Sequence, residues 1–196
     1  MDILETIKEK IRAIPTSELS SGVRAVISHI ETAEKYFHRA KNKNEEELFT
    51  DVIYRTNHAF EGILKEAYTI LTGKDASKKT PYHIEKHLSS NNVFKIRVLD
   101  LFTNYRTEWR NTSTHDYQLS FTEQETFLSI VSVSAFINIL LDQMIEHISF
   151  LKERKETESR VEELKSKILT YEDLSFLEKT TALLAEFSKA MQQSNN

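Results

Sequence analysis

The sequence predicts an all-α protein, a helical bundle followed by a helical extension. Glycine and proline are scarce, with 3 and 2 residues among 196, against usual shares of about 7% and 5%. Few tight turns are therefore available. Apolar residues recur every three or four positions through most of the chain, which is the helical period. Hydrophobic residues make up 39% of the chain and charged residues 29%, as in soluble proteins that bury their own core.

Periodicity and stop signals together predict helices over residues 3–14, 23–40, 45–71, 81–88, 93–109 and from 122 onward. Pro15 ends the first helix because proline cannot continue one. The polar stretch KNKNEEE closes the second helix, and Gly73 provides the left-handed C-terminal stop of the third. Thr80 and Pro81 are a good N-cap and first-turn pair for the fourth.

The last two core helices have distinct signals. Thr122 and Glu125 predict a capping box for the longest helix, whose segment FLSIVSVSAFINILL is apolar on more than one face. Such a helix is either central or pressed against a second subunit. The uncharged run Thr126–Leu141 is shorter than the ~20 residues that span a bilayer, so we expect a core helix and no membrane segment. The residues expected to be buried on the preceding helix are Ile96, Leu99, Leu101 and Phe102.

The apolar stripe fades after Leu151, and the charged stretch KERKETESR follows. We therefore predict a helical domain over 1–151 and a helical extension over 152–196 that serves interaction or oligomerisation. The alternatives are that the extension folds back on the core, contacts a second subunit or binds a partner. The chain has no cysteine, and its N-terminal stretch lacks the apolar core of a signal peptide. Both observations favour a reducing cytoplasm.

One short stretch, EWRNTSTHDYQLS at 108–120, carries several chemically active side chains between two helical patterns. Its weak helix formers favour a break or cap, where Arg110 and His115 can point into one cleft. Arg24 and His29 have the same spacing but lie inside an uninterrupted helix, where five residues turn two side chains ~140° apart. Helix N-termini also present free N–H groups that suit a phosphate. The stretch is the best candidate site in the sequence.

The string RNTSTHDY, from Arg110 to Tyr117, resembles the R-x4-6-H signature of HEPN domains. The closest form is the R-x4-H-x-Y of HEPN toxins that pair with a minimal nucleotidyltransferase antitoxin. The resemblance implies a HEPN-like bundle and an endoribonuclease that needs no metal or cofactor, in which the ribose 2′-OH attacks the adjacent phosphate. It implies His115 as acid/base and Arg110 as transition-state clamp. Asn111 would orient the phosphate or His115, and Tyr117 would line the site as a target of nucleotidylation.

One histidine cannot be both base and acid in one turnover, so a homodimer that combines two Arg110–His115 pairs is chemically sensible. Related domains often place a polar residue of the third helix beside this motif, which makes His58 and Glu61 supporting candidates. The partners implied are RNA, a second copy of the chain, and an antitoxin or defence-complex protein. The setting would be a toxin–antitoxin pair or antiviral defence.

Structural interpretations of the same residues remain open. Arg110 could pair with Glu108 or Asp116, His115 could cap a helix, and Tyr117 could be core. The alternative function is a catalytically silent HEPN-like adaptor or assembly subunit. His83 and His87 lie four residues apart, but the string HIEKH is not the H-E-x-x-H of zinc proteases and no third ligand is evident. We therefore expect no metal site.

Overall fold

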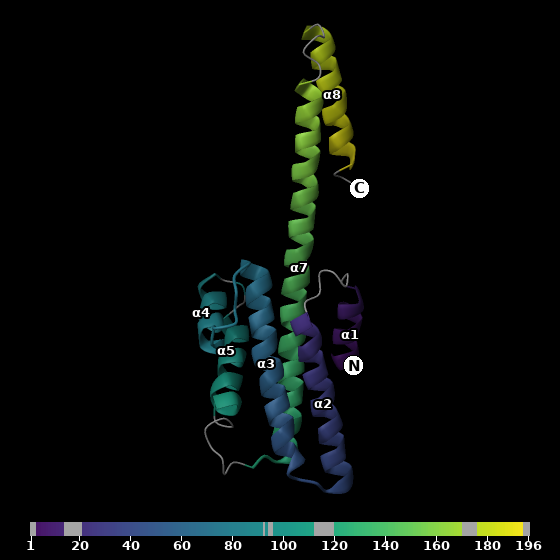
Figure 1. Ribbon diagram of the computed structural model, residues 1–196. Helices are drawn as coiled ribbons and strands as arrows, with labels where there is room; N and C mark the ends of the chain where they lie inside the picture. Colours follow the sequence, from purple (N-terminus) through teal and green to yellow (C-terminus); the bar gives the residue numbers. More distant parts are fainter. Residues whose placement is uncertain are drawn as a thin grey trace. The chain divides into compact units, whose positions relative to one another are not determined.

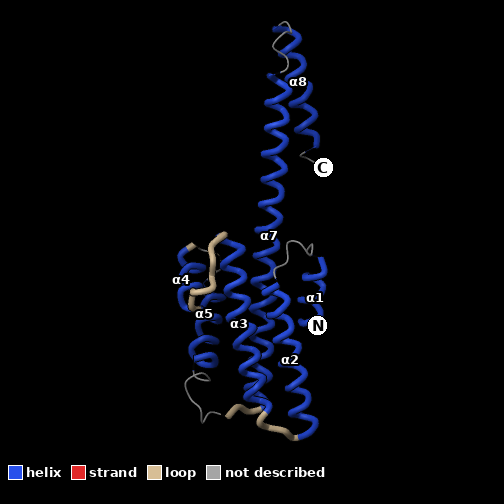
Figure 2. Tube along the Cα trace, in the orientation of Figure 1, coloured by secondary structure: helices blue, strands red, loops and turns tan. Residues whose placement is uncertain are grey.

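The computed structural model describes residues 3–13, 21–91, 93, 96–111, 120–169 and 176–193. Every described element is helical (Figure 1 and Figure 2), so the predicted all-α class is confirmed. Along the chain the elements are α1 (Ile3–Ala13), α2 (Ser21–Lys43), α3 (Leu48–Thr72), α4 (Pro81–Ser90), α5 (Ile96–Asn104), the π-helical turn η1 (Tyr105–Asn111), α7 (Glu123–Leu169) and α8 (Phe176–Gln193).

The chain divides into two compact units, Met1–His147 and Ile148–Asn196, and the division falls inside α7. The first unit holds α1 to η1 and the first part of α7. The second unit consists of the remaining part of α7 together with α8. The roles assigned above to 1–151 and 152–196 stay predictions.

An aromatic cluster joins three helices in the core of the first unit. Phe102 of α5 stacks on Phe136 of α7 with 4.4 Å between ring centroids, and Phe60 of α3 lies 5.9 Å from Phe136. All three side chains are buried. Truncating a buried phenylalanine to alanine typically costs about 3–5 kcal/mol, so this cluster is a main source of the stability that holds α5 and α7 against α3.

Helices α2 and α3 run side by side (Figure 1) and approach closely at one glycine. A Cβ atom added to Gly62 would lie 2.7 Å from Cγ2 of Val26, well inside van der Waals contact. The missing side chain therefore sets the spacing of the two helices. This spacing decides how the outward side chains of α2 and α3 meet.

The predicted helix ends are confirmed at three places. Gly73 has φ 68° and donates its N–H to Thr69 O at 2.8 Å. The Thr80 side chain accepts a hydrogen bond from the backbone N–H of His83. Thr122 N donates to Glu125 Oε2 at 2.8 Å, and Glu125 N donates back to Thr122 Oγ1 at 3.3 Å, which is the expected capping box.

One boundary, one helix type and one burial expectation were wrong. Helix α3 begins at Leu48 because Asn44 adopts a left-handed φ of 56° and residues 45–47 form a turn. The helix expected over 93–109 is α5 followed by η1, so its hydrogen bonding changes at Tyr105. Leu101 is 55% exposed rather than buried, since in a regular helix it lies ~100° from Phe102, which occupies the core face.

Helix α7 is the one element of the described chain that is long and apolar enough to cross a membrane by length and composition. Half of its most apolar window is buried against other parts of the protein. Core helices of soluble proteins have the same character, so a soluble protein is compatible with this helix. The cytoplasmic location stays a prediction.

Candidate functional site

Arg110 lies near the end of η1 and is held by a carboxylate of α3. Its Nε donates to Glu61 Oε1 at 2.5 Å, and both side chains are about a quarter exposed, at 26% and 27%. A partly exposed ion pair contributes little to stability, ~1 kcal/mol or less. The main effect of the ion pair is geometric, because the Glu61 carboxylate holds the Nε edge of the Arg110 guanidinium against α3.

The π-helical turn explains how Arg110 reaches α3. In a π-helix residue i bonds to residue i+5, so residues five apart share a face; in an α-helix the same step turns the side chain by ~140°. Tyr105 and Arg110 are five apart, and both contact α3, Tyr105 at Asn57 and Arg110 at Glu61. The change from α to π geometry therefore directs Arg110 to its carboxylate.

Tyr105 anchors the start of η1 in the core. Its buried hydroxyl lies 3.1 Å from Thr56 Oγ1, 3.1 Å from Asn57 Oδ1 and 3.0 Å from Ser129 Oγ, which links η1 to α3 and α7. Burial raises the pKa of Tyr105 to about 12, so the hydroxyl stays protonated as a donor. The Trp109 ring stacks on Tyr105 with 6.4 Å between centroids. These contacts tie the start of η1 to the core of the first unit.

A second arginine of η1 forms a more deeply buried ion pair that sequence reasoning missed. Arg106 Nε contacts both carboxylate oxygens of Glu85 at 2.9 and 3.0 Å, and Thr103 Oγ1 donates to the same carboxylate. The guanidinium also lies over the ring of Tyr82, 5.4 Å from its centroid. Burial raises the pKa of Glu85 despite the opposing effects of Arg106 and Thr103. This pair fixes η1 against α4.

The structure places some of the other predicted site residues, and their roles stay predictions. His115 and Tyr117 lie outside the described residues, as does the side chain of Asn111, so their positions relative to Arg110 stay predictions. Of the two α3 candidates, Glu61 contacts Arg110. His58 instead stacks on His29 of α2, with 5.3 Å between ring centroids and an interplanar angle of 20°.

The described residues contain no group of three or more side chains that could hold a metal ion. His83 is engaged locally, with Nδ1 2.6 Å from the hydroxyl of Thr80. His87 packs edge-on against Tyr68, and its carbonyl accepts from Asn91. Capping and packing account for both histidines.

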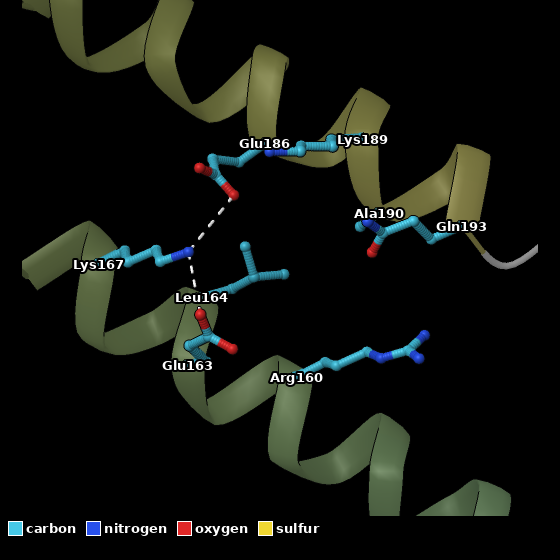
Figure 3. A pocket seen from close by; sticks show the side chains of 8 residues that line it. All are labelled: Arg160, Glu163, Leu164, Lys167, Glu186, Lys189, Ala190 and Gln193. Carbon is cyan, nitrogen blue, oxygen red and sulfur yellow. Dashed lines mark ion pairs between the residues drawn. The ribbon is translucent and has the colours of Figure 1, made fainter.

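A small cleft of about 230 Å³ lies within the second unit, between the end of α7 and α8 (Figure 3). Lys167 of α7 reaches Glu163 Oε1 at 3.0 Å and Glu186 Oε2 of α8 at 3.8 Å. Ligand sites usually enclose ~300–1,000 Å³, and here opposite charges face each other across two helices. We interpret the cleft as the ion-paired seam of a helical hairpin.

Comparisons of the chain with protein-family models, curated proteins and solved structures give no match. The resemblance to HEPN domains therefore rests on the residues from Arg110 to Tyr117, and the function has to be inferred from the chemistry of those residues and their neighbours.

Proposed function

We propose that this chain is a HEPN-type endoribonuclease that cuts RNA without a metal ion, through a composite site formed by Arg110 and His115 of two subunits. The observation that carries the proposal is the placement of Arg110. It is anchored by Glu61 at the end of a π-helical turn, directly before the segment that contains His115. An arginine oriented in this way suits an anion at the same place.

The reaction follows from these side chains. One His115 removes the proton from the ribose 2′-OH as a new bond forms between that oxygen and the phosphorus. The bond from phosphorus to the 5′-oxygen breaks, and His115 of the second subunit protonates the leaving oxygen. Arg110 stabilises the negative charge that grows on the phosphoryl oxygens. The products are a 2′,3′-cyclic phosphate and a 5′-hydroxyl.

A cleavage assay with defined RNA tests the proposed chemistry. The purified chain should cut in EDTA and leave 2′,3′-cyclic phosphate ends, because no metal-bound water takes part. A matched RNA with a 2′-deoxy nucleotide at the cleaved position should resist, since the attacking oxygen is missing. Product ends are read by mass spectrometry. If EDTA abolishes cleavage, or if the deoxy substrate is cut, the proposed mechanism is contradicted. If the wild-type protein, purified free of partners, cuts no RNA, the proposal that it is a ribonuclease is contradicted.

A homodimer is part of the proposal, and α7 offers a surface for it. Phe127, Leu128 and Val131 lie within little more than one turn and are 56%, 53% and 39% exposed. Large apolar side chains gathered on one face of a helix commonly mark an interface. A two-fold contact through this face would bring the same patch of both chains together.

Sedimentation tests the dimer. The wild type should sediment as a dimer at micromolar concentration, and Leu128→Glu should sediment as a monomer with an unchanged helical spectrum, because the interface would bury an unpaired carboxylate. Thr69→Glu places the same charge on an exposed position of α3 and should remain dimeric. A wild type that is monomeric at micromolar yet active at nanomolar concentration contradicts both the dimer and the composite site.

The alternative function is a silent HEPN-like adaptor, and one observation favours it. Glu61 already compensates the charge of Arg110, as expected of an arginine kept for structure alone. The second unit fits either function as a surface for an antitoxin or defence-complex protein, because α8 exposes Leu184, Phe187 and Met191 at 60–66%. Cleavage by the wild type decides between the two.

A further inference from the structure

A cleft of about 420 Å³ lies on the face shared by α2 and α3, and Arg110 is not among the described residues that line it. Its volume is within the ~300–1,000 Å³ typical of small-ligand sites. Four of its lining residues carry aromatic rings, one is an arginine and one is a carboxylate. They are His29, Tyr36, Asp51, Tyr54, Arg55 and His58.

The cleft has a preformed stacking platform. His29 and His58 are stacked at 5.3 Å with an interplanar angle of 20°. His29 is partly buried, whereas His58 is exposed, and Tyr54 beside it is 46% exposed. Flat, solvent-facing rings of this kind stack on nucleobases in proteins that bind single strands.

Arg55 supplies the charge of the cleft. Its Nη1 lies 3.3 Å from His29 Nδ1, and the ring nitrogen is the acceptor because a guanidinium can only donate. Burial, together with the charges of His58 and Arg55, lowers the pKa of His29 and so favours the neutral ring that can accept. A guanidinium has five N–H donors, so this one contact orients the fork and leaves it able to hold an anion. The cleft thus combines an arginine that can bind a phosphate with rings that can stack on a base.

The cleft and Glu61, the carboxylate that holds Arg110, lie on one side of α3. Tyr54 and Glu61 are seven residues apart, two helical turns, so they share a face at an axial distance of ~10 Å. Glu61 holds Arg110. Tyr54 in the cleft therefore lies ~10 Å along α3 from the carboxylate that holds Arg110, a separation that neighbouring nucleotides of one strand can bridge.

We propose that the cleft between α2 and α3 binds a nucleotide of single-stranded RNA next to the one that is cut, with Arg55 on its phosphate and Tyr54 and His58 on its base. Asp51, at the edge of the cleft, suits an exocyclic amino group of the base. A second arginine, Arg110, is held against the same helix by Glu61, which favours a strand over a free nucleotide. The inference rests on the proposed ribonuclease activity, because the bound strand is the one cleaved beside Arg110.

Binding is measured separately from cleavage by using a 2′-O-methylated oligoribonucleotide, which cannot be cut, and following its fluorescence anisotropy. Arg55→Gln should weaken binding about tenfold and lower the slope of log K against log salt by about 0.7, the share of one phosphate contact on a single strand.

Tyr54→Ala should weaken binding about tenfold, whereas Tyr54→Phe keeps the ring and should bind as the wild type. Arg39→Gln removes the same charge from an exposed position of α2 outside the cleft and should have a smaller effect on both quantities. With cleavable RNA, Arg55→Gln should raise KM and leave kcat unchanged.

The outcomes separate the inference from the proposed function. Equal binding by Arg55→Gln and Arg39→Gln overturns the inference, even if the wild type cleaves RNA. Arg55-dependent binding by a wild type that cannot cleave unmodified RNA supports the cleft and refutes the ribonuclease. AMP serves as the free-nucleotide probe, and Arg55-dependent binding of AMP without binding of the oligonucleotide would overturn the assignment to a strand.

Discussion

Replacing Arg110 or His115 with alanine will lower RNA cleavage by about 10²-fold or more while the protein stays folded. The loss is large because each residue acts in the transition state, His115 by moving a proton and Arg110 by stabilising charge. The fold persists because the Arg110–Glu61 pair is partly exposed and contributes little to stability. Initial rates and thermal unfolding of the same samples measure the two effects.

Arg24→Ala is the matched control, because Arg24 is exposed on α2 with the same spacing to a histidine as Arg110. It should cleave as the wild type. Glu61→Gln removes the charge that orients Arg110 but keeps an oxygen that can accept from it, so it should lose less activity than Arg110→Ala. Full activity in His115→Ala would exclude this histidine from the reaction.

The parts of the fold that depend on local chemistry could be predicted from the sequence. A capping box needs only Thr122 and Glu125 three residues apart, and a left-handed stop needs only a glycine at Gly73. Both are short-range features with few alternatives. The helices between such signals follow from apolar periodicity, which is why the all-α class was confirmed.

The contacts that shape the site could not be predicted in the same way. Arg110 pairs with Glu61, 49 residues earlier, and Arg106 pairs with Glu85, 21 residues earlier. No periodic pattern relates such distant positions. The π-helical turn was missed as well. The apolar spacing of 3.6 residues identifies a helix, but it does not distinguish a regular α-helix from one that changes to π-helical hydrogen bonding for a single turn. Glu61 was a candidate only through the resemblance to HEPN domains.

Arg106→Met should destabilise the first unit by about 3–5 kcal/mol at pH 7, the largest stability effect that we expect from a charged residue. The side chains of Arg106 and Glu85 are only 14% and 7% exposed, and removing one partner of a buried pair leaves an uncompensated charge. Urea unfolding followed by the fluorescence of Trp109, the single tryptophan, measures the free energy. Arg12→Met breaks an exposed pair with Glu5 and should cost about 0.5 kcal/mol or less.

The pH dependence of this variant distinguishes a buried charge from lost packing. Burial already raises the pKa of Glu85, and without Arg106 the pKa rises further. A carboxyl whose pKa is higher in the folded state than in the unfolded state lowers the free energy of unfolding when the pH is above the unfolded-state pKa. At a pH below that pKa the carboxyl is protonated in both states, and it no longer affects stability. The loss of stability in Arg106→Met, relative to the wild type, should therefore shrink as the pH falls from 7 toward 5.

The double variant Glu85→Met/Arg106→Met has no charge to bury, so it should recover most of the stability at pH 7 and show no such trend. A deficit that is equal at both pH values would mean that Arg106 acts through packing on Tyr82 rather than through its charge.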